Sequence, residues 1–237
     1  FRQGASSIGL MGTWTARAVG DPLFNSLLRN NAYFAGVDFQ HSWRQRTWVV
    51  SGFLAGSRVT GSASVMAATQ QNSTHYYQRP DATYLSYDPA RTNLGGHIGE
   101  IAISHNGSWF GSAAYKEVSP GLELNDLGFM GRADYRAFST LAGYQNFRAG
   151  KLFRQYFIGG GTTSAWNFGG VSVFQSALGF FNGTLANFWT ANINLSGSPQ
   201  YQSDRFTRGG PVADVPASWN VNGTIRTDSR KPIILAL

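Results

Sequence analysis

The sequence contains no cysteine, few charged residues and no long run of apolar residues. The absence of cysteine excludes disulfides and thiolate metal sites, and it fits an exported bacterial protein. No stretch of about 18 apolar residues occurs, so a transmembrane helix is excluded. The segment that begins at Phe1 lacks the basic and apolar regions of a signal peptide. We therefore expect any signal peptide to lie outside this sequence.

The composition favours β structure. Charged residues make up only 13% of the chain and aromatic residues 14%, with 29 glycines and 7 tryptophans. Such a chain is poor in helix formers and rich in residues that suit strands and turns. The mean hydropathy of −0.21 is compatible with a membrane β-barrel, because only alternate residues of each strand face lipid.

The formal net charge of +7 does not indicate a nucleic-acid-binding protein. Lysine and arginine are scattered singly and never form a run of five or more. We expect these charges to line a polar lumen or the loops of a barrel, where arginine is common.

Alternation of apolar and polar residues with period two recurs through most of the chain. In one segment Val37 and Phe39 share a face, while Asp38 points to the other. Strands are expected over 7–19, 32–43, 47–57, 96–105, 108–118, 129–146, 152–163, 168–180, 184–196 and 218–228, with a last, truncated strand from Pro232. The pattern thus predicts about eleven strands, with one short helical turn near 63–71 within a loop.

The expected connections alternate between short and long. Short ones are predicted at 44–46, Asn106-Gly107, 147–150, Asn182-Gly183 and 229–231, and both Asn-Gly pairs suit a tight hairpin with positive φ. Mostly longer ones are predicted at 20–31, 58–95, 119–128 and 197–217, with a shorter one at 163–167. A barrel with unequal rims requires this alternation, whereas a soluble β-sandwich would not sort its loops by rim.

These patterns predict an all-β protein, an antiparallel up-and-down transmembrane β-barrel. Residues 1–237 are expected to form a single barrel segment that is truncated at both ends. The chain stops at Ile-Ile-Leu-Ala-Leu without a terminal aromatic residue or a complete strand, so the segment would be an incomplete part of a larger barrel.

The longest expected loop is rich in tyrosine, arginine and aspartate. Tyrosine rings stack on sugars and arginine and aspartate bind hydroxyls, so this loop is a candidate ligand-binding lid. The alternative, which we favour, is that its charges pair internally and hold a long loop in one shape. The candidates are Tyr76, Tyr77, Arg79, Asp81, Asp88 and Arg91.

The stretch 119–129 is ambiguous in the same way. Glu123 and Asp126 are acids that lie close enough in sequence to bind a cation or to serve glycoside hydrolysis. Their spacing does not match a calcium loop, however, and Asn125-Asp126 is ordinary turn chemistry. Asn125 and Asp126 are therefore candidates for ligand binding or for loop structure.

Several charged residues are predicted to face the lumen of the barrel. Arg132, Asp134 and Arg136 alternate along the expected strand 129–146, on the face that carries Thr140 and Ala142. Arg17 and Asp38 lie on the polar faces of their own segments. Such charges either tune permeation or form salt-bridge networks that fill the barrel.

No pattern of catalytic, metal or cofactor-binding residues is present. The four histidines, at positions 41, 75, 97 and 105, do not have zinc-ligand spacing. Neither a nucleophile elbow nor a phosphate-binding loop occurs. The sequence predicts no catalytic residues, no metal and no cofactor, and we do not expect an enzyme.

The loop motifs as an ordered set resemble those of a known family. They are Tyr76-Tyr77-Gln78-Arg79-Pro80-Asp81, Asp88-Pro89-Ala90-Arg91-Thr92, Ser119-Pro120-Gly121, Asn125-Asp126-Leu127-Gly128-Phe129 with Arg132-Ala133-Asp134, Arg208-Gly209-Gly210-Pro211, and Asp228-Ser229-Arg230-Lys231. The family is an uncharacterised group of bacterial proteins in which a family-9-type carbohydrate-binding module precedes a large C-terminal barrel domain. The resemblance runs over nearly the whole chain and implies an exported precursor and the bacterial outer membrane, but no mechanism.

The expected function is that of an outer-membrane barrel in a Gram-negative bacterium, forming a pore or a surface scaffold linked to glycan binding or uptake. The alternative is a plugged barrel that acts as a membrane anchor or as a subunit of a larger envelope complex. An outer-membrane hydrolase of glycans or lipids is a third and weaker hypothesis. The expected partners are outer-membrane lipid, a glycan and other envelope proteins, and not nucleic acid.

Overall fold

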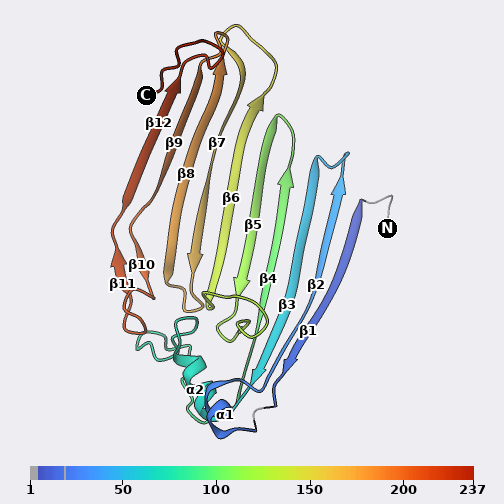
Figure 1. Cartoon of the computed structure of the whole chain (residues 1–237), viewed down its shortest axis with the longest axis vertical. Helices are drawn as coiled ribbons and strands as arrows, with labels where there is room; N and C mark the ends of the chain where they lie inside the picture. Colours follow the sequence, from blue (N-terminus) through green and yellow to red (C-terminus); the bar gives the residue numbers. More distant parts are fainter. Residues whose placement is uncertain (1–4, 19) are drawn as a thin grey trace.

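The computed structural model describes residues 5–18 and 20–237 and is an all-β protein (Figure 1). Ten strands form one antiparallel sheet in the order β1-β2-β3-β4-β5-β6-β7-β8-β9-β12. The strands are β1 (Ser6–Ala16), β2 (Asn31–Trp43), β3 (Trp48–Thr60), β4 (Asn93–His105), β5 (Trp109–Val118), β6 (Tyr135–Asn146), β7 (Phe153–Trp166), β8 (Ser172–Leu185), β9 (Thr190–Ser198) and β12 (Ser218–Arg226). The predicted up-and-down order is confirmed, because each of these strands pairs with the next one in the sheet along the chain.

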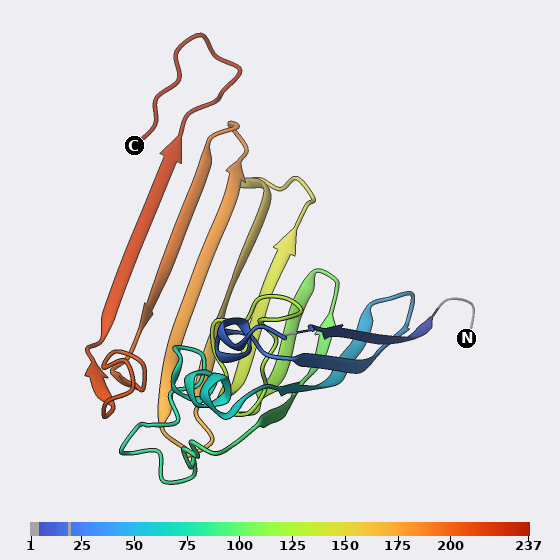
Figure 2. The same ribbon diagram turned by 60° about the horizontal axis from the view of Figure 1, so that its bottom comes forward.

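The sheet is open, and β1 and β12 are its two edges. In the described part of the chain these two strands do not pair with each other. The sheet is strongly curved and twisted, so that the N-terminal strands turn well away from the direction of the C-terminal ones (Figure 2). The described residues therefore form a curved antiparallel sheet and not a closed barrel.

The connections sort largely by length, as the sequence predicts, with 167–171 the short exception at its end of the sheet. Segments 17–18, 20–30, 61–92, 119–134, 167–171 and 199–217 all lie at one end of the sheet, which we call the loop end (Figure 1). The short connections lie at the opposite end, which we call the turn end. The expected helical segment is confirmed as α2 (Ala63–Gln71).

The loop end also holds structure that the sequence analysis did not predict. Helix α1 (Pro22–Leu27) begins at Asp21, whose side chain accepts a hydrogen bond from Leu23 N at 2.7 Å. Strands β10 (Tyr201–Ser203) and β11 (Ala213–Val215) form a small separate sheet. In the described residues no helix has the length and apolarity needed to span a membrane.

Several details of the predicted strands and turns are wrong. Asn182 and Gly183 lie inside β8 rather than in a turn, opposite Asn192 and Ala191 of β9. Asn106-Gly107 does connect two strands, but without positive φ; the left-handed residues at the turn end are instead Arg44, Gln45, Arg46 and Phe188. The segment from Pro232 forms only an isolated bridge, between Arg226 and Ala236.

The two faces of the sheet differ in chemistry. The register places alternate residues of all ten strands on what we call the apolar face, among them Leu10, Val37, Leu54, Ile101, Ile103, Phe138, Ile158, Ile193, Leu195 and Val221. The polar face carries small and polar residues such as Thr13, Asp38, Ser51, Ser112, Ser139, Thr163, Asn194 and Asn222, with a few phenylalanines between them.

The buried core lies at the loop end and not under the sheet. One cluster combines Ala32, Val59 and Leu94 of the strands with Met66 of α2 and Tyr77. A second cluster combines Val118, Leu122 and Ala133. The strand residues of both clusters belong to the polar face, so the long connections fold over this face. We call the connections together with α1, α2, β10 and β11 the loop body.

Gly96 sets how closely the loop body approaches the sheet. A Cβ atom at this position would overlap the backbone nitrogen of Leu122 and the hydroxyl of Ser119. Replacing Gly96 by alanine is therefore expected to push segment 119–134 off β4 and to destabilise the loop body by roughly 1–3 kcal/mol. Limited proteolysis of the loop body would measure the change. Gly12→Ala is the matched control, because a Cβ at Gly12 meets nothing closer than 4.0 Å; equal cleavage rates in both variants would contradict the prediction.

Candidate functional site

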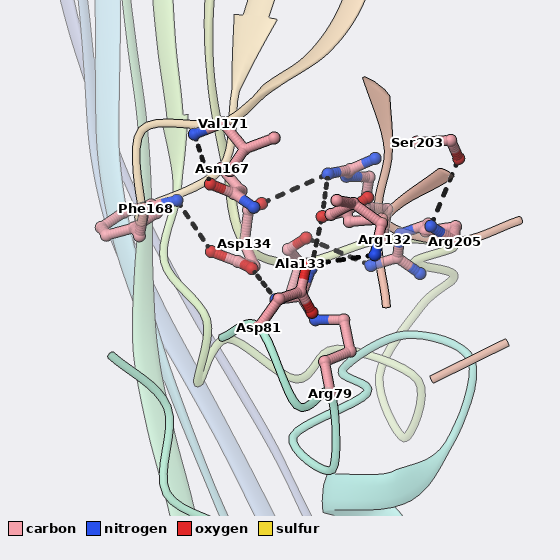
Figure 3. Close-up of polar contacts among 12 residues, drawn as sticks. Arg79, Asp81, Arg132, Ala133, Asp134, Asn167, Phe168, Val171, Ser203 and Arg205 are labelled. Carbon is pink, nitrogen blue, oxygen red and sulfur yellow. Dashed lines mark hydrogen bonds and ion pairs between the residues drawn. The ribbon is translucent and has the colours of Figure 1, made fainter. Parts of the chain in front are cut away.

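The loop body is held together by two buried networks of charges. The first, which we call the Arg79 network, contains Arg79, Tyr84, Arg132, Asp134 and Asp204 (Figure 3). Arg79 Nη1 lies 2.5 Å from Asp204 Oδ2, and Arg79 Nη2 lies 2.5 Å from Asp134 Oδ2. All three of these side chains are buried. Arg79 thus joins three separate connections. It lies in the connection before β4, Asp134 lies in the connection after β5, and Asp204 lies in the connection after β9.

Asp134 accepts more hydrogen bonds than Asp204, the other carboxylate of this network. Its Oδ2 accepts a second hydrogen bond from the Tyr84 hydroxyl at 2.6 Å, and its Oδ1 accepts one from Phe168 N at 3.0 Å. Its backbone has a φ of 62°, in the left-handed region that aspartate tolerates better than most residues. Because this conformation is not extended, β6 begins only at the next residue, Tyr135.

Arg205 adds a further positive charge beside the network. It donates to the carbonyl oxygens of Thr74 at 2.8 Å and Ala133 at 3.3 Å, and it also contacts Ser73 O. Burial and the neighbouring charge of Arg132 lower the pKa of Arg205 to about 10. Carbonyl oxygens rather than a carboxylate therefore hold this guanidinium in place.

The second network, which we call the Glu123 network, contains Arg17, Arg29, His75, Glu123 and Asp126. Glu123 Oε2 lies 3.1 Å from His75 Nε2 and 3.3 Å from Arg29 Nη1. Asp126 bridges Arg29 and Arg17, with 2.7 Å between its Oδ1 and Arg17 Nη1. Glu123 N donates to the Ser57 hydroxyl of β3 at 3.0 Å. The network therefore links segment 119–134 to the connection after β1, to the loop that follows α2, and to β3 of the sheet.

Glu123 and Asp126 thus each join two basic side chains, His75 and Arg29 for Glu123 and Arg29 and Arg17 for Asp126. Burial by itself raises the pKa of Glu123, but the hydrogen bond from His75 and the charge of Arg29 outweigh it, and the net direction is downward. The described residues contain no group of three or more potential metal ligands. Chemically, this arrangement cross-links separate connections of the loop body.

Acid is expected to loosen the loop body through Glu123. Because the folded state lowers the pKa of this group, its contribution to stability is present above the ordinary glutamate pKa of about 4.3 and is lost as the pH falls through the folded value. Amide exchange in 61–92, corrected for intrinsic rates, should rise as the pH is lowered through this range. The variant Glu123→Gln should show a flatter pH dependence, and an unchanged profile in that variant would contradict the assignment.

Most loop residues predicted from the sequence lie in or beside these networks. Tyr77 is buried in the core, where burial raises its pKa to about 12. Tyr76 lies under the Arg205 guanidinium, 5.5 Å from the ring centre. Asp88 exchanges backbone hydrogen bonds with the Gln70 side chain. Asn125 Oδ1 accepts from Met130 N at 2.8 Å.

Asp81 and Arg91 are less involved. Exposed Asp81 accepts a hydrogen bond from Val212 N at 3.2 Å, and Arg91 is half-buried and makes no ion pair with any carboxylate of the described residues. The interpretation of these loops as internally tied is thus the one that the contacts support.

The residues predicted to face a lumen have different locations. Arg132 and Asp134 lie in the loop body and not in a strand, and Arg17 follows β1 and reaches Asp126. Asp38 does lie on the polar face, beside Gly9. Arg136 lies on the apolar face, because it is opposite Glu117 and in line with Phe138. Arg136 does share its face of β6 with Thr140 and Ala142, as the sequence predicts, but the same face also carries Phe138.

No sequence pattern pointed to Arg29, Asp204 or Arg205, and His75 had no predicted role of its own. Each of these residues acts through partners far away in the sequence, such as Asp204, which is 125 positions from Arg79. Arg132 was wrongly expected in a strand, because the local alternation does not show its distant partner, Asp204. The one available signal was the adjacent pair Asp204-Arg205 in a long connection.

Aromatic side chains form two rows on the apolar face, one at each end of the strands. The turn-end row consists of Trp43, Trp48, Trp109, Tyr144 and Tyr156, several of them in contact, with 6.1 Å between the ring centres of Trp43 and Trp48 and 4.8 Å between those of Trp109 and Tyr144. The loop-end row consists of Trp14, Tyr33, Trp166 and Trp219. The residues between the rows are mainly aliphatic, and Leu10 is 84% exposed.

Comparison with known proteins identifies the family. The profile of a domain of unknown function, DUF5916, matches residues 49–237, which is more than half of the chain. No curated protein and no solved structure matches the chain. The match agrees with the expectation of an uncharacterised family. It gives no evidence for the carbohydrate-binding module or for the barrel that the resemblance implies.

Proposed function

Because this chain belongs to the DUF5916 family, whose description assigns no activity, we propose its function from its surfaces: it forms the membrane-spanning sheet of an outer-membrane β-barrel in a Gram-negative bacterium. The supporting observation is the exposed apolar face bordered by two aromatic rows. Lipid-facing surfaces of such barrels have an apolar band with aromatic girdles at both interfaces.

The spacing of the two rows fits a membrane. Tyr33 and Trp43 are ten residues apart on β2, and Tyr156 and Trp166 are ten apart on β7. Ten residues span about 33 Å along a strand, and a strand tilt of 35–45° reduces this to roughly 25 Å across the bilayer, the usual height of the apolar band. Two separate strands give the same value.

A soluble sheet of this size would need a second layer. Sheets bury an apolar face against helices or another sheet. Within the described residues no element covers the apolar face, and the loop body packs on the polar one. Lipid is therefore the covering that we propose, and the edges of β1 and β12 would be paired in a closed barrel.

In a closed barrel the polar face would line the interior, which supports a pore, and the loop body would stand at one mouth. The alternative is a plugged barrel that acts as an anchor or as a subunit of an envelope complex. It is favoured by the buried networks that fix the loop body over the polar face. The glycan uptake that the family resemblance implies belongs to the pore hypothesis.

Ion conductance in planar bilayers, with heat-modifiable gel migration to verify folding, tests the proposal. We expect a folded protein that inserts and conducts, and the Asp134→Ala variant, which loosens the loop body, to conduct more. Block by added oligosaccharides would support glycan uptake. A folded, inserted protein that is silent in both forms would support the plugged anchor, and a protein that does not insert would reject the membrane assignment.

A further inference from the structure

Three basic side chains interrupt the apolar face near the loop-end aromatic row. They are Arg58 of β3, His97 of β4 and Arg136 of β6, which we call the cationic row. Arg58 lies opposite Tyr33 and Gly95, and His97 lies opposite Gly56, so the first two are diagonal neighbours on adjacent strands. Arg136 lies opposite Glu117 of the intervening strand.

The cationic row has an excess of positive charge. Glu117 is its one carboxylate in the described residues, with Oε1 2.7 Å from His97 Nε2 and Oε2 2.9 Å from Arg136 Nε. Arg58 is exposed and makes no ion pair in the described part of the chain. The Arg136 guanidinium carbon lies 4.1 Å from the centre of the Phe168 ring, and the Arg136 side chain is 42% exposed. Two arginines and a histidine thus face a single acid.

Two apolar grooves begin at the cationic row and run toward the middle of the sheet. One, of about 490 Å³, is lined by Val37, Leu54, Gly99, Ile101 and Tyr115 and reaches His97 and Glu117. The other, of about 470 Å³, is lined by Trp14, Tyr33, Ala35 and Gly56 and reaches Arg58. The grooves exist because glycines replace side chains on this face, Gly99 in the first and Gly12 and Gly56 in the second.

We propose that this surface binds a lipid with an anionic phosphate headgroup, with the phosphate at Arg58 beside His97, the acyl chains in the two grooves, and Arg136 adding positive charge three strands away. Arginine pairs with phosphate through its paired N–H donors, and exposed aliphatic grooves match acyl chains. The charge and the grooves meet at the same level of the sheet, as the headgroup and the chains of a lipid do. The inference rests on the proposed function and names a partner for the apolar face.

Quenching of tryptophan fluorescence by brominated lipids tests this inference on the full chain. The protein would be reconstituted in phosphatidylcholine vesicles that contain either brominated phosphatidic acid or brominated phosphatidylcholine. Trp14 lies in the second groove, so a lipid bound there quenches it. We expect phosphatidic acid to be enriched at the protein, and R58Q to reduce that enrichment by roughly five-fold, with a smaller reduction for R136Q, which lies three strands away and is paired with Glu117.

The matched control is R148Q, which makes the same change of charge at an exposed position of the turn end. It should leave the enrichment unchanged. Equal loss in all three variants, or equal quenching by both brominated lipids, would overturn the inference while leaving the membrane assignment intact. Absence of quenching by brominated phosphatidylcholine would reject the proposed function itself, so the two failures are distinguishable.

Discussion

Leu54→Arg is expected to destabilise the folded protein in a bilayer by about 2–4 kcal/mol, the usual cost of an arginine near the midplane on the lipid face of a barrel. Leu54 lies midway along β3 on the apolar face and is 59% exposed. A charge that replaces it would have to leave water for hydrocarbon. Reversible urea unfolding from vesicles measures the difference.

The control for this substitution is Ser51→Arg on the same strand. Ser51 lies on the polar face, opposite Gln40 and Ala102. An arginine there would face the proposed interior, and we expect a much smaller loss. If the apolar face instead contacts water, Leu54→Arg should be close to neutral, as most exposed substitutions are. That result would reject the membrane assignment.

Asp134→Ala is expected to destabilise the loop body by about 3–5 kcal/mol, the range found when one partner of a buried ion pair is removed. The substitution leaves Arg79 with one of its two carboxylates and removes the acceptors of Tyr84 and Phe168. Amide exchange in segments 74–92 and 199–217 would report the loss. The sheet should keep its protection, because its ladders do not depend on this residue.

Two further variants separate the network from a general effect of substitution. Asp81→Ala removes an exposed aspartate with one hydrogen bond, to Val212 N, and should change exchange only slightly. Arg79→Met combined with Asp134→Leu removes both charges, and it should recover part of the stability that Asp134→Ala loses, because no charge is then buried alone. A double variant as unstable as the sum of its single changes would mean that the two residues act independently.

The fold was largely predictable from the sequence because alternation is a direct consequence of a sheet with unlike faces. Leu54 and Ser51 differ in chemistry because their faces differ, and the same reasoning located all ten strands of the sheet. The errors lie where long-range contacts override local preference. Asn182-Gly183 favours a turn locally, but pairing with β7 and β9 extends β8 past it.

The loop body was predictable only in outline. A long connection rich in arginine and aspartate suggested internal pairing, and Arg79 and Asp134 do pair. Period two alone, however, extended a strand through Arg132 and Asp134, because the left-handed backbone at Asp134 depends on tertiary partners. Charge alone did not indicate that Arg29 and His75 hold Glu123, since these residues come from three separate connections.

The two parts of the molecule also differ in how far apart their partners are along the chain, and this has a consequence for the order of folding. Every pairing in the large sheet joins strands that follow one another, save that β9 and β12 are separated by the small β10-β11 sheet. The networks instead join residues 109 positions apart, as for Arg17 and Asp126, or 125 apart, as for Arg79 and Asp204. Local pairings form quickly and distant ones slowly. We therefore expect the strands to pair hairpin by hairpin and the two networks of the loop body to form later.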